Sequence, residues 1–271
     1  MNFTSKRRTS QKRGVLFYKM ISGMIAAFLF LPFPMSKMRQ ATAAERERLS
    51  SYTTYYNAED KGRTKNIQLA CKRIHGITVQ PYGEFSFNKT VGKRTKAAGF
   101  QDAKIILDGE FVLGIGGGVC QVSTTLYNAA LLAGLTVTES HPHSLAVSYV
   151  PPSRDAMVSS TSDLCFFNPH TEPIRITASA VDGTLKICVY GQKQGGRYEI
   201  ISYVTQELPP PEPIVKIGAE EKILRREKTG IKSEAYLERY VGNALVERKR
   251  LRKDTYAPVQ GIIVKKIAQQ P

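Results

Sequence analysis

The most constraining feature of the sequence is a glycine run that leads into an apolar segment with helical spacing, GIGGGVCQVSTTLYNAALLAGL, at residues 114–135. The glycines allow backbone conformations that a Cβ would forbid, and the apolar side chains that follow recur at helical spacing. Cys120 lies at the junction. Free N–H groups and the positive dipole end of a helix favour a thiolate there, and could also hold an oxyanion. The run therefore predicts a nucleophilic Cys120 suited to acyl transfer.

The glycine run does not have the pattern of a nucleotide site. It lacks the Lys-Ser/Thr ending of a P-loop, and Val119 stands where the third glycine of a GxGxxG motif would be. We therefore exclude nucleotide binding, and we expect no cofactor.

A nucleophilic cysteine usually needs a base, and the dense histidine cluster SHPHS follows about twenty residues later, at 140–144. On an extended segment His141 and His143 would point to the same face, so either could reach Cys120. Asp155 follows and could orient the imidazole. Two plainer interpretations stay open: Cys120 as a small packed hydrophobic residue, and the histidines as part of a surface turn.

The other cysteines are Cys71, Cys165 and Cys188. No C-x-x-C pair occurs, so the spacing indicates neither a metal nor a redox site, and we expect no metal. Cys165 and Cys188 lie in strand-like apolar runs, either as core residues or as a single cross-strand pair. Cys71 has the pattern of a buried helix position.

Residues 1–44 have the order of an export signal: six basic residues, an apolar run at 20–34 and the small-residue motif Ala-Thr-Ala at 41–43. Basic residues interrupt the region before this motif, and residues 15–35 nearly suffice to span a bilayer. A retained membrane anchor therefore stays open beside a cleaved signal peptide. In either case we expect an extracytoplasmic protein, secreted or anchored at the cell envelope.

Residues 45–200 are predicted to form an α+β domain in which one main helix, starting at the motif cysteine, packs on a mostly antiparallel sheet. A shorter helix is expected at 66–74, and hairpin turns at Asp108-Gly109 and Asp182-Gly183. The expected extended segments are 50–57, 76–87, 104–113, 136–139, 146–150, 174–181 and 184–190.

Four prolines between 209 and 213 predict a stiff linker at 201–215, followed by a small basic β module at 216–271. Strands are expected there at 234–241, 244–250 and 259–267. The chain has a formal net charge of +16, and the module holds 14 basic and 7 acidic residues. Outside a cell such a surface suits anionic wall polymers or a membrane surface, with no nucleic acid expected; a solvated face without a partner is equally open.

From about 51 to 191 the sequence closely resembles the VanW family, through GIGGGVCQVSTTLYNAALLAGL, HPHS and VSYVPPSRDA. The tail more loosely resembles the β extension found after VanW domains, which is related to G5 modules. The family is named for an accessory protein of B-type vancomycin resistance clusters, and some members are held to be L,D-transpeptidases. The resemblance implies Cys120 as nucleophile and the pair His141 and His143, without deciding between them.

Two departures qualify the resemblance. The Ser-His-Gly-Cys motif of YkuD-type L,D-transpeptidases is absent, so activity cannot be inherited from that class. Ser153 also stands where a glycine is expected before Arg-Asp.

Two functions follow as alternatives. The first is a cysteine acyltransferase of the L,D-transpeptidase type acting on peptidoglycan stem peptides, with Cys120, a histidine and Asp155 as catalytic candidates. The second is a non-catalytic envelope-binding module linked to glycopeptide resistance, in which the glycines at 116–118 and the histidines shape a peptide or glycan groove. The candidate substrate-binding residues are Gly116, Gly117, Gly118, Gln121, Ser123 and Arg154. A reactive Cys120 would favour the enzyme, and an inert buried thiol the binding module.

Overall fold

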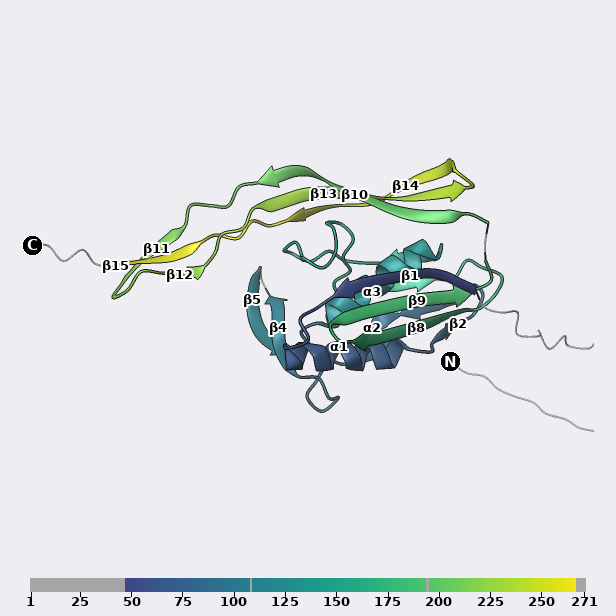
Figure 1. Cartoon of the computed structure of the whole chain (residues 1–271), viewed down its shortest axis with the longest axis horizontal. Coiled ribbons are helices and arrows are strands. Elements are labelled where there is room, and N and C mark those ends of the chain that lie inside the picture. Colours follow the sequence, from purple (N-terminus) through teal and green to yellow (C-terminus); the bar gives the residue numbers. More distant parts are fainter. Residues whose placement is uncertain (1–46, 108, 194, 267–271) are drawn as a thin grey trace, which may run out of the picture. The chain divides into compact units, whose positions relative to one another are not determined.

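The structure is a computed structural model that describes residues 47–107, 109–193 and 195–266 (Figure 1). The predicted signal or anchor at 1–44 lies outside the described residues. Within them, no helix is both long and apolar enough to cross a membrane.

The central sheet is antiparallel and has the strand order β1-β9-β8-β2 (Figure 1). Its strands are β1 (Glu47–Tyr55), β9 (Thr184–Gly191), β8 (Ile174–Val181) and β2 (Thr78–Val79). The β8–β9 hairpin turns at Asp182 and Gly183, both with positive φ, as the sequence predicts for an Asp-Gly turn.

Two helices of equal length pack on this sheet. α1 (Lys61–Ile74) lies against β8, and α3 (Val119–Leu132) lies against β1 and β9. α3 also contacts α1 and β10, and it is buried on almost every side, as expected for a helix with few charged residues. The hydroxyl of Ser50 donates to the carbonyl of Ala129 at 2.6 Å and ties the sheet to the helix.

Smaller elements complete this part of the chain. A second antiparallel sheet has the order β3-β7-β6, with β3 (Glu84–Ser86), β7 (Cys165–Phe167) and β6 (Thr136–Glu139), and the short helix α2 (Phe87–Val91) follows β3. The hairpin of β4 (Asp102–Leu107) and β5 (Glu110–Ile115) forms a two-stranded sheet of its own.

The C-terminal part consists of two three-stranded sheets. One has the order β10-β13-β14, with β10 (Arg197–Leu208), β13 (Gly230–Val241) and β14 (Ala244–Tyr256). The other has the order β11-β15-β12, with β11 (Ile214–Gly218), β15 (Ile262–Lys266) and β12 (Lys222–Arg225), and its β11–β15 pair is parallel.

The α+β class, the main helix at the motif cysteine and the separate C-terminal β sheets are confirmed. Two local predictions are wrong. Residues 146–150 bend and form no strand. Residues 201–208 of the predicted linker belong to β10, because they pair with β13. Of the two alternatives for Cys165 and Cys188, the cross-strand pair is not formed, because Cys165 lies in β7, between β3 and β6, whereas Cys188 lies in the central sheet. Cys188 and Cys71 are buried, as predicted for core positions.

Candidate active site

The glycine run brings the start of α3 into close contact with α1 and β4. Gly118 adopts a φ of +101°, and a Cβ there would lie 2.9 Å from side-chain carbons of both Arg63 and Ile67. A Cβ on Gly117 would lie 2.5 Å from the carbonyl oxygen of Lys104. Only glycine fits these positions without displacing the neighbouring elements. The glycines therefore fix the place of Cys120, which is the second residue of α3 and is partly exposed.

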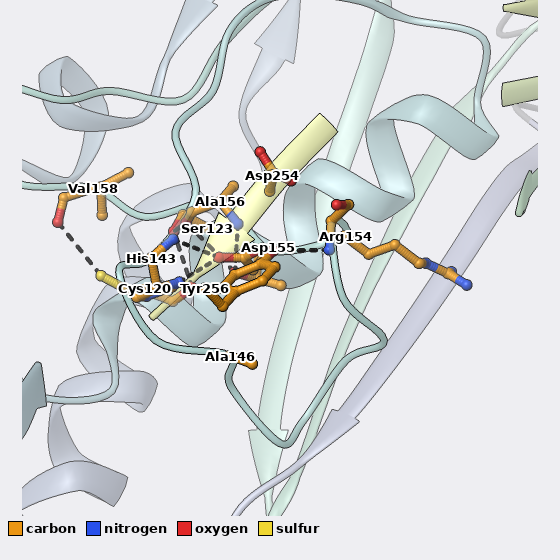
Figure 2. A network of polar contacts seen from close by, with 12 residues as sticks. Cys120, Ser123, His143, Ala146, Arg154, Asp155, Ala156, Val158, Asp254 and Tyr256 are labelled. Atoms are coloured by element: carbon orange, nitrogen blue, oxygen red, sulfur yellow. Dashed lines mark hydrogen bonds and ion pairs between the residues drawn. The ribbon is translucent and has the colours of Figure 1, made fainter. Parts of the chain in front are cut away.

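Cys120, His143 and Asp155 come together in a line of polar contacts (Figure 2). The His143 Nδ1 atom lies 2.6 Å from Oδ2 of Asp155, and the same oxygen accepts the backbone N–H of His143 at 2.7 Å. This contact leaves Nε2 as the ring nitrogen that can act on the thiol of Cys120, whose pKa His143 lowers. On its other side the thiol contacts the carbonyl oxygen of Val158 at 3.4 Å.

The electrostatics of these three groups favour a thiolate and an imidazolium. Burial would raise the pKa of the Cys120 thiol, but the hydrogen bond and charge of His143, a backbone hydrogen bond at Val158 and the charge of Arg94 together lower this pKa below its usual value. Burial would lower the pKa of His143, yet Asp155 and Cys120 raise it to about 9. Burial likewise opposes ionisation of Asp155, but contacts with His143 and other donors hold its pKa below the usual range.

Two backbone amides at the start of α3 are already used. The N–H of Val119 donates to Gly116 at 3.1 Å, and the N–H of Gln121 donates to Gly118 at 3.0 Å. The expectation that this helix start offers a set of free amides to an oxyanion is therefore only partly met. Among the described residues, the amide of Cys120 itself is the candidate donor that remains at this point.

A cleft of about 1000 Å³ opens in front of Cys120 and His143. Gly116, Gly117 and Gly118 line it together with residues of the β4–β5 hairpin and aromatic side chains, including Tyr149. Among the described lining residues there are five cations and one carboxylate, Asp60. The cations are Arg63, Lys93, Arg94, Lys104 and Lys228. The cleft is therefore basic, and it suits a ligand that carries carboxylates.

The ring of His141 pairs with Glu139 rather than with the thiol of Cys120. Its Nε2 atom lies 2.9 Å from Oε1 of Glu139, and its side chain is 40% exposed. The backbone of His141 forms an isolated antiparallel bridge with Met157. Of the two histidines that the sequence offers, His143 is the one that contacts Cys120.

Three of the substrate-binding candidates have structural contacts of their own. Gln121 lines the cleft but accepts a hydrogen bond from Arg63 at 2.6 Å and donates to the carbonyl of Tyr55. Ser123 is fully buried and donates to the carbonyl of Ala156 at 2.6 Å.

Arg154 points away from Cys120 (Figure 2), and its Nε donates to Asn128. Ser123 and Arg154 therefore lie outside the cleft lining and hold the segment around Asp155 onto α3.

Ser153, which stands where the VanW resemblance leads us to expect glycine, has a backbone conformation that favours glycine. Ser153 has a φ of 60°, in the left-handed region where glycine is favoured. Its N–H donates to the hydroxyl of Tyr256 at 2.8 Å, and its Oγ lies 2.7 Å from that of Ser233. Two contacts from the C-terminal sheet thus hold this conformation.

Sequence reasoning missed the residues that contact Asp155 from β14 and most of the cations of the cleft. Tyr256 and Arg252 both contact the carboxylate of Asp155. Arg252 belongs to the basic module that the sequence predicts to offer a charged surface, but its side chain is only 10% exposed. The one signal in the sequence was Asp254, which follows Arg252 by two positions and would therefore lie on the same face of a strand.

Comparisons with known proteins agree with the motifs. Residues 62–190 match the family model described as VanW like protein. The chain is 44% identical over 145 residues to the protein YoaR of Bacillus subtilis. The aligned segment makes up 53% of this chain and 48% of that protein. The chain is 31% identical over 78 residues to the Vancomycin B-type resistance protein VanW of Enterococcus faecalis, covering 29% of this chain and 28% of that protein. The chain thus spans about half, or less, of the length of these relatives.

Two solved G5 domains also resemble part of the chain. The HP0197-G5 structure has a TM-score of 0.16 and 16% identity, covering 27% of this chain and 99% of that one. The IgA1 protease G5 domain has a TM-score of 0.20 and 22% identity, covering 27% and 89%. Scores this low carry no functional argument. The family match covers the segment that holds the glycine run and the histidine pair, so residues 62–190 form a VanW-like domain.

Proposed function

We propose that the protein is a cysteine acyltransferase of the L,D-transpeptidase type that acts on peptidoglycan stem peptides. The observation that carries the proposal is the contact line from Cys120 through His143 to Asp155, at the wall of a basic cleft. A thiolate with a positioned acid and base is the machinery of covalent acyl transfer.

The cleft supports a donor that ends in a carboxylate. A tetrapeptide stem carries its terminal carboxylate one residue beyond the bond to be cleaved. Arg94 is a candidate to meet such a group, because this residue lines the cleft and its charge acts on Cys120. Hydrogen bonds from Arg94 to Asn88 Oδ1 at 2.7 Å and to the carbonyl of Ser159 at 3.2 Å hold the guanidinium in place.

Acylation begins with attack of the Cys120 thiolate on the carbonyl carbon before the terminal D-residue. A carbon–sulfur bond forms, and the carbon–nitrogen bond to the terminal residue breaks. Protonated His143 gives its proton to the departing amine, and Asp155 stabilises the imidazolium before that transfer. The amide of Cys120 and the cations of the cleft stabilise the oxyanion of the tetrahedral intermediate. The products are a thioester on Cys120, neutral His143 and the free D-amino acid.

Deacylation reverses these roles. The amine of a neighbouring stem attacks the thioester carbon, and His143 takes the proton that the amine loses. The carbon–sulfur bond breaks, which restores the thiolate and the imidazolium and leaves a peptide crosslink. Water in place of the amine gives hydrolysis.

The proposed location is outside the cytoplasm, at the cell envelope, where these stems occur. The basic strand β14 exposes Arg248, Lys249 and Arg250, which supports contact with anionic wall polymers or a membrane surface. Arg252 is left out of this surface because it is buried against Asp155.

The test is incubation of the full chain with purified tetrapeptide muropeptides, followed by mass spectrometry. We expect loss of the terminal residue, a covalent acyl-enzyme and crosslinked dimers. Cys120→Ala should abolish all three, whereas Cys165→Ala, which removes another partly exposed thiol, should leave them intact. No product from the folded wild-type protein, together with an ordinary reactivity of Cys120, would leave the non-catalytic envelope-binding module as the function.

A further inference from the structure

Asp155 is bound from two parts of the chain, one at each oxygen. Oδ2 accepts both the ring and the backbone N–H of His143. Oδ1 accepts the hydroxyl of Tyr256 at 2.5 Å and lies 3.4 Å from Nη2 of Arg252. Asp155 itself is only 1% exposed. The carboxylate is thus fixed between a histidine of the VanW-like domain and two side chains of β14.

The direction of the tyrosine hydrogen bond follows from its partners. The N–H of Ser153 can only donate, so the oxygen of Tyr256 accepts this bond at 2.8 Å and its own proton goes to Asp155. Burial, together with the negative charge of Asp155, raises the pKa of Tyr256. The phenol therefore stays protonated and remains a donor at any physiological pH.

Arg252 binds Asp155 in two ways, through the backbone carbonyl of Asp155 and through the charge of its carboxylate. Nη1 donates to the carbonyl oxygen of Asp155 at 2.8 Å, and Nε donates to Asp254 at 2.6 Å. Because Asp254 fixes the guanidinium from behind, Arg252 has one orientation from which to compensate the buried charge of Asp155. Figure 2 shows Tyr256 beside Asp155, on the side away from the Val158 contact of Cys120.

The docking of β14 also reaches the backbone around His143. The N–H of Ala257, directly after the strand, donates to the carbonyl of Ser144 at 2.9 Å. Residues 62–190, which match the family model, contain neither Arg252 nor Tyr256. These supports therefore come from outside the matched domain.

We propose that Arg252 and Tyr256 are positioning residues, which hold Asp155 against His143 and make the C-terminal sheet part of the reaction centre. The proposal rests on the proposed function for its effect on turnover. Its effect on Cys120 itself can be measured without any substrate.

The main test compares Tyr256→Phe with Tyr240→Phe in the full chain. Tyr240 donates to Glu238 at 2.6 Å, so the control removes a similar tyrosine–carboxylate bond from the same sheet. We expect Tyr256→Phe to lower kcat about tenfold or more with KM within twofold, and Tyr240→Phe to change neither by more than twofold. In an Asp155→Ala background, Tyr256→Phe should cost less than a further twofold, because the carboxylate that it positions is gone.

A parallel measurement keeps this proposal separate from the proposed function. The rate of Cys120 alkylation by iodoacetamide at pH 7 should fall several-fold in Tyr256→Phe and stay unchanged in Tyr240→Phe. If the wild type transfers no acyl group but this difference appears, the proposed function fails and the positioning role stands.

Two results would overturn the positioning role: a folded Tyr256→Phe protein with wild-type kcat and alkylation rate, or an equal fractional loss in the presence and absence of the Asp155 carboxylate. If Tyr256→Phe does not fold, Arg252→Lys replaces it, since lysine keeps the charge but cannot reach both atoms of Asp155. The same expected and contrary results then apply.

Discussion

The same oxygen of Asp155 accepts two hydrogen bonds from His143, one from ring Nδ1 at 2.6 Å and one from the backbone N–H at 2.7 Å. The ring is therefore fixed relative to its own main chain as well as to the carboxylate. This double contact selects His143 over His141, whose ring is paired with Glu139 at the protein surface.

Alkylation should distinguish Cys120 from Cys165, although both are partly exposed. The pKa of Cys120 is lowered despite burial, chiefly by His143, so iodoacetamide should label it readily at pH 7. Burial and the carboxylates of Asp163 and Glu139 raise the pKa of Cys165 to about 12, so its labelling should stay slow up to pH 9. Peptide mass spectrometry over a pH series measures both rates, and equal labelling at pH 7 would contradict the electrostatics described above.

His143 should make stability depend on pH in the alkaline range. Although burial opposes the shift, contacts with Asp155 and Cys120 raise the pKa of His143 from its ordinary 6.5 to about 9 in the folded protein. A raised folded pKa gives a contribution that is complete below about pH 6.5 and lost as the pH rises through about 9. The gap in Tm between wild type and His143→Ala should thus be largest near pH 6 and shrink by pH 9.5. A gap that widens over this range would show that His143 is not held as an imidazolium.

Gly118→Ala should destabilise the fold by about 1–3 kcal/mol, because it combines a positive φ with a Cβ that meets Arg63 and Ile67. Gly195→Ala is the control, since its Cβ meets nothing within 4 Å and its φ is not in the left-handed region. That change should stay within about 0.5 kcal/mol. Urea unfolding followed by circular dichroism measures both values, and equal stability of the two variants would mean that the glycine is not required.

The exposed cations of β14 should bind anionic envelope material. We expect a triple change of Arg248, Lys249 and Arg250 to Gln to reduce sedimentation with purified cell walls. Binding by the wild type should weaken with salt, because the Debye length is about 10 Å at 0.1 M. A triple Gln variant with the same change in charge serves as the control; its sites are the exposed Lys65 and Lys72 of α1 and Lys186 of β9. Equal loss in both variants would indicate attraction by net charge alone.

Local sequence signals predicted the parts of the fold that depend on near neighbours. The α3 helix follows from its spacing, and the β8–β9 hairpin follows from Asp182-Gly183. The strand predicted at 146–150 failed because β propensity says nothing about a partner, and no strand pairs with it.

In the candidate site too, residues in local motifs could be predicted, whereas contacts between distant parts of the chain could not. Cys120, His143 and Asp155 could be named because they lie within 36 positions of each other in recognisable motifs. Tyr256 could not, since its contact with Asp155 spans 101 positions and depends on how two sheets dock. The serine at 153 was the local sign of this docking, because only a supported backbone holds a left-handed serine there.

The distance along the chain between Asp155 and Tyr256 sets the order in which the site is assembled during synthesis. A ribosome adds about 5–20 residues per second, so Tyr256 is joined to the chain roughly 5–20 s after Asp155. During that interval the carboxylate has neither its tyrosine nor its arginine partner. If these partners position Asp155 as proposed, the nascent protein carries a less reactive cysteine, which gains its full reactivity when β14 has been made and has docked.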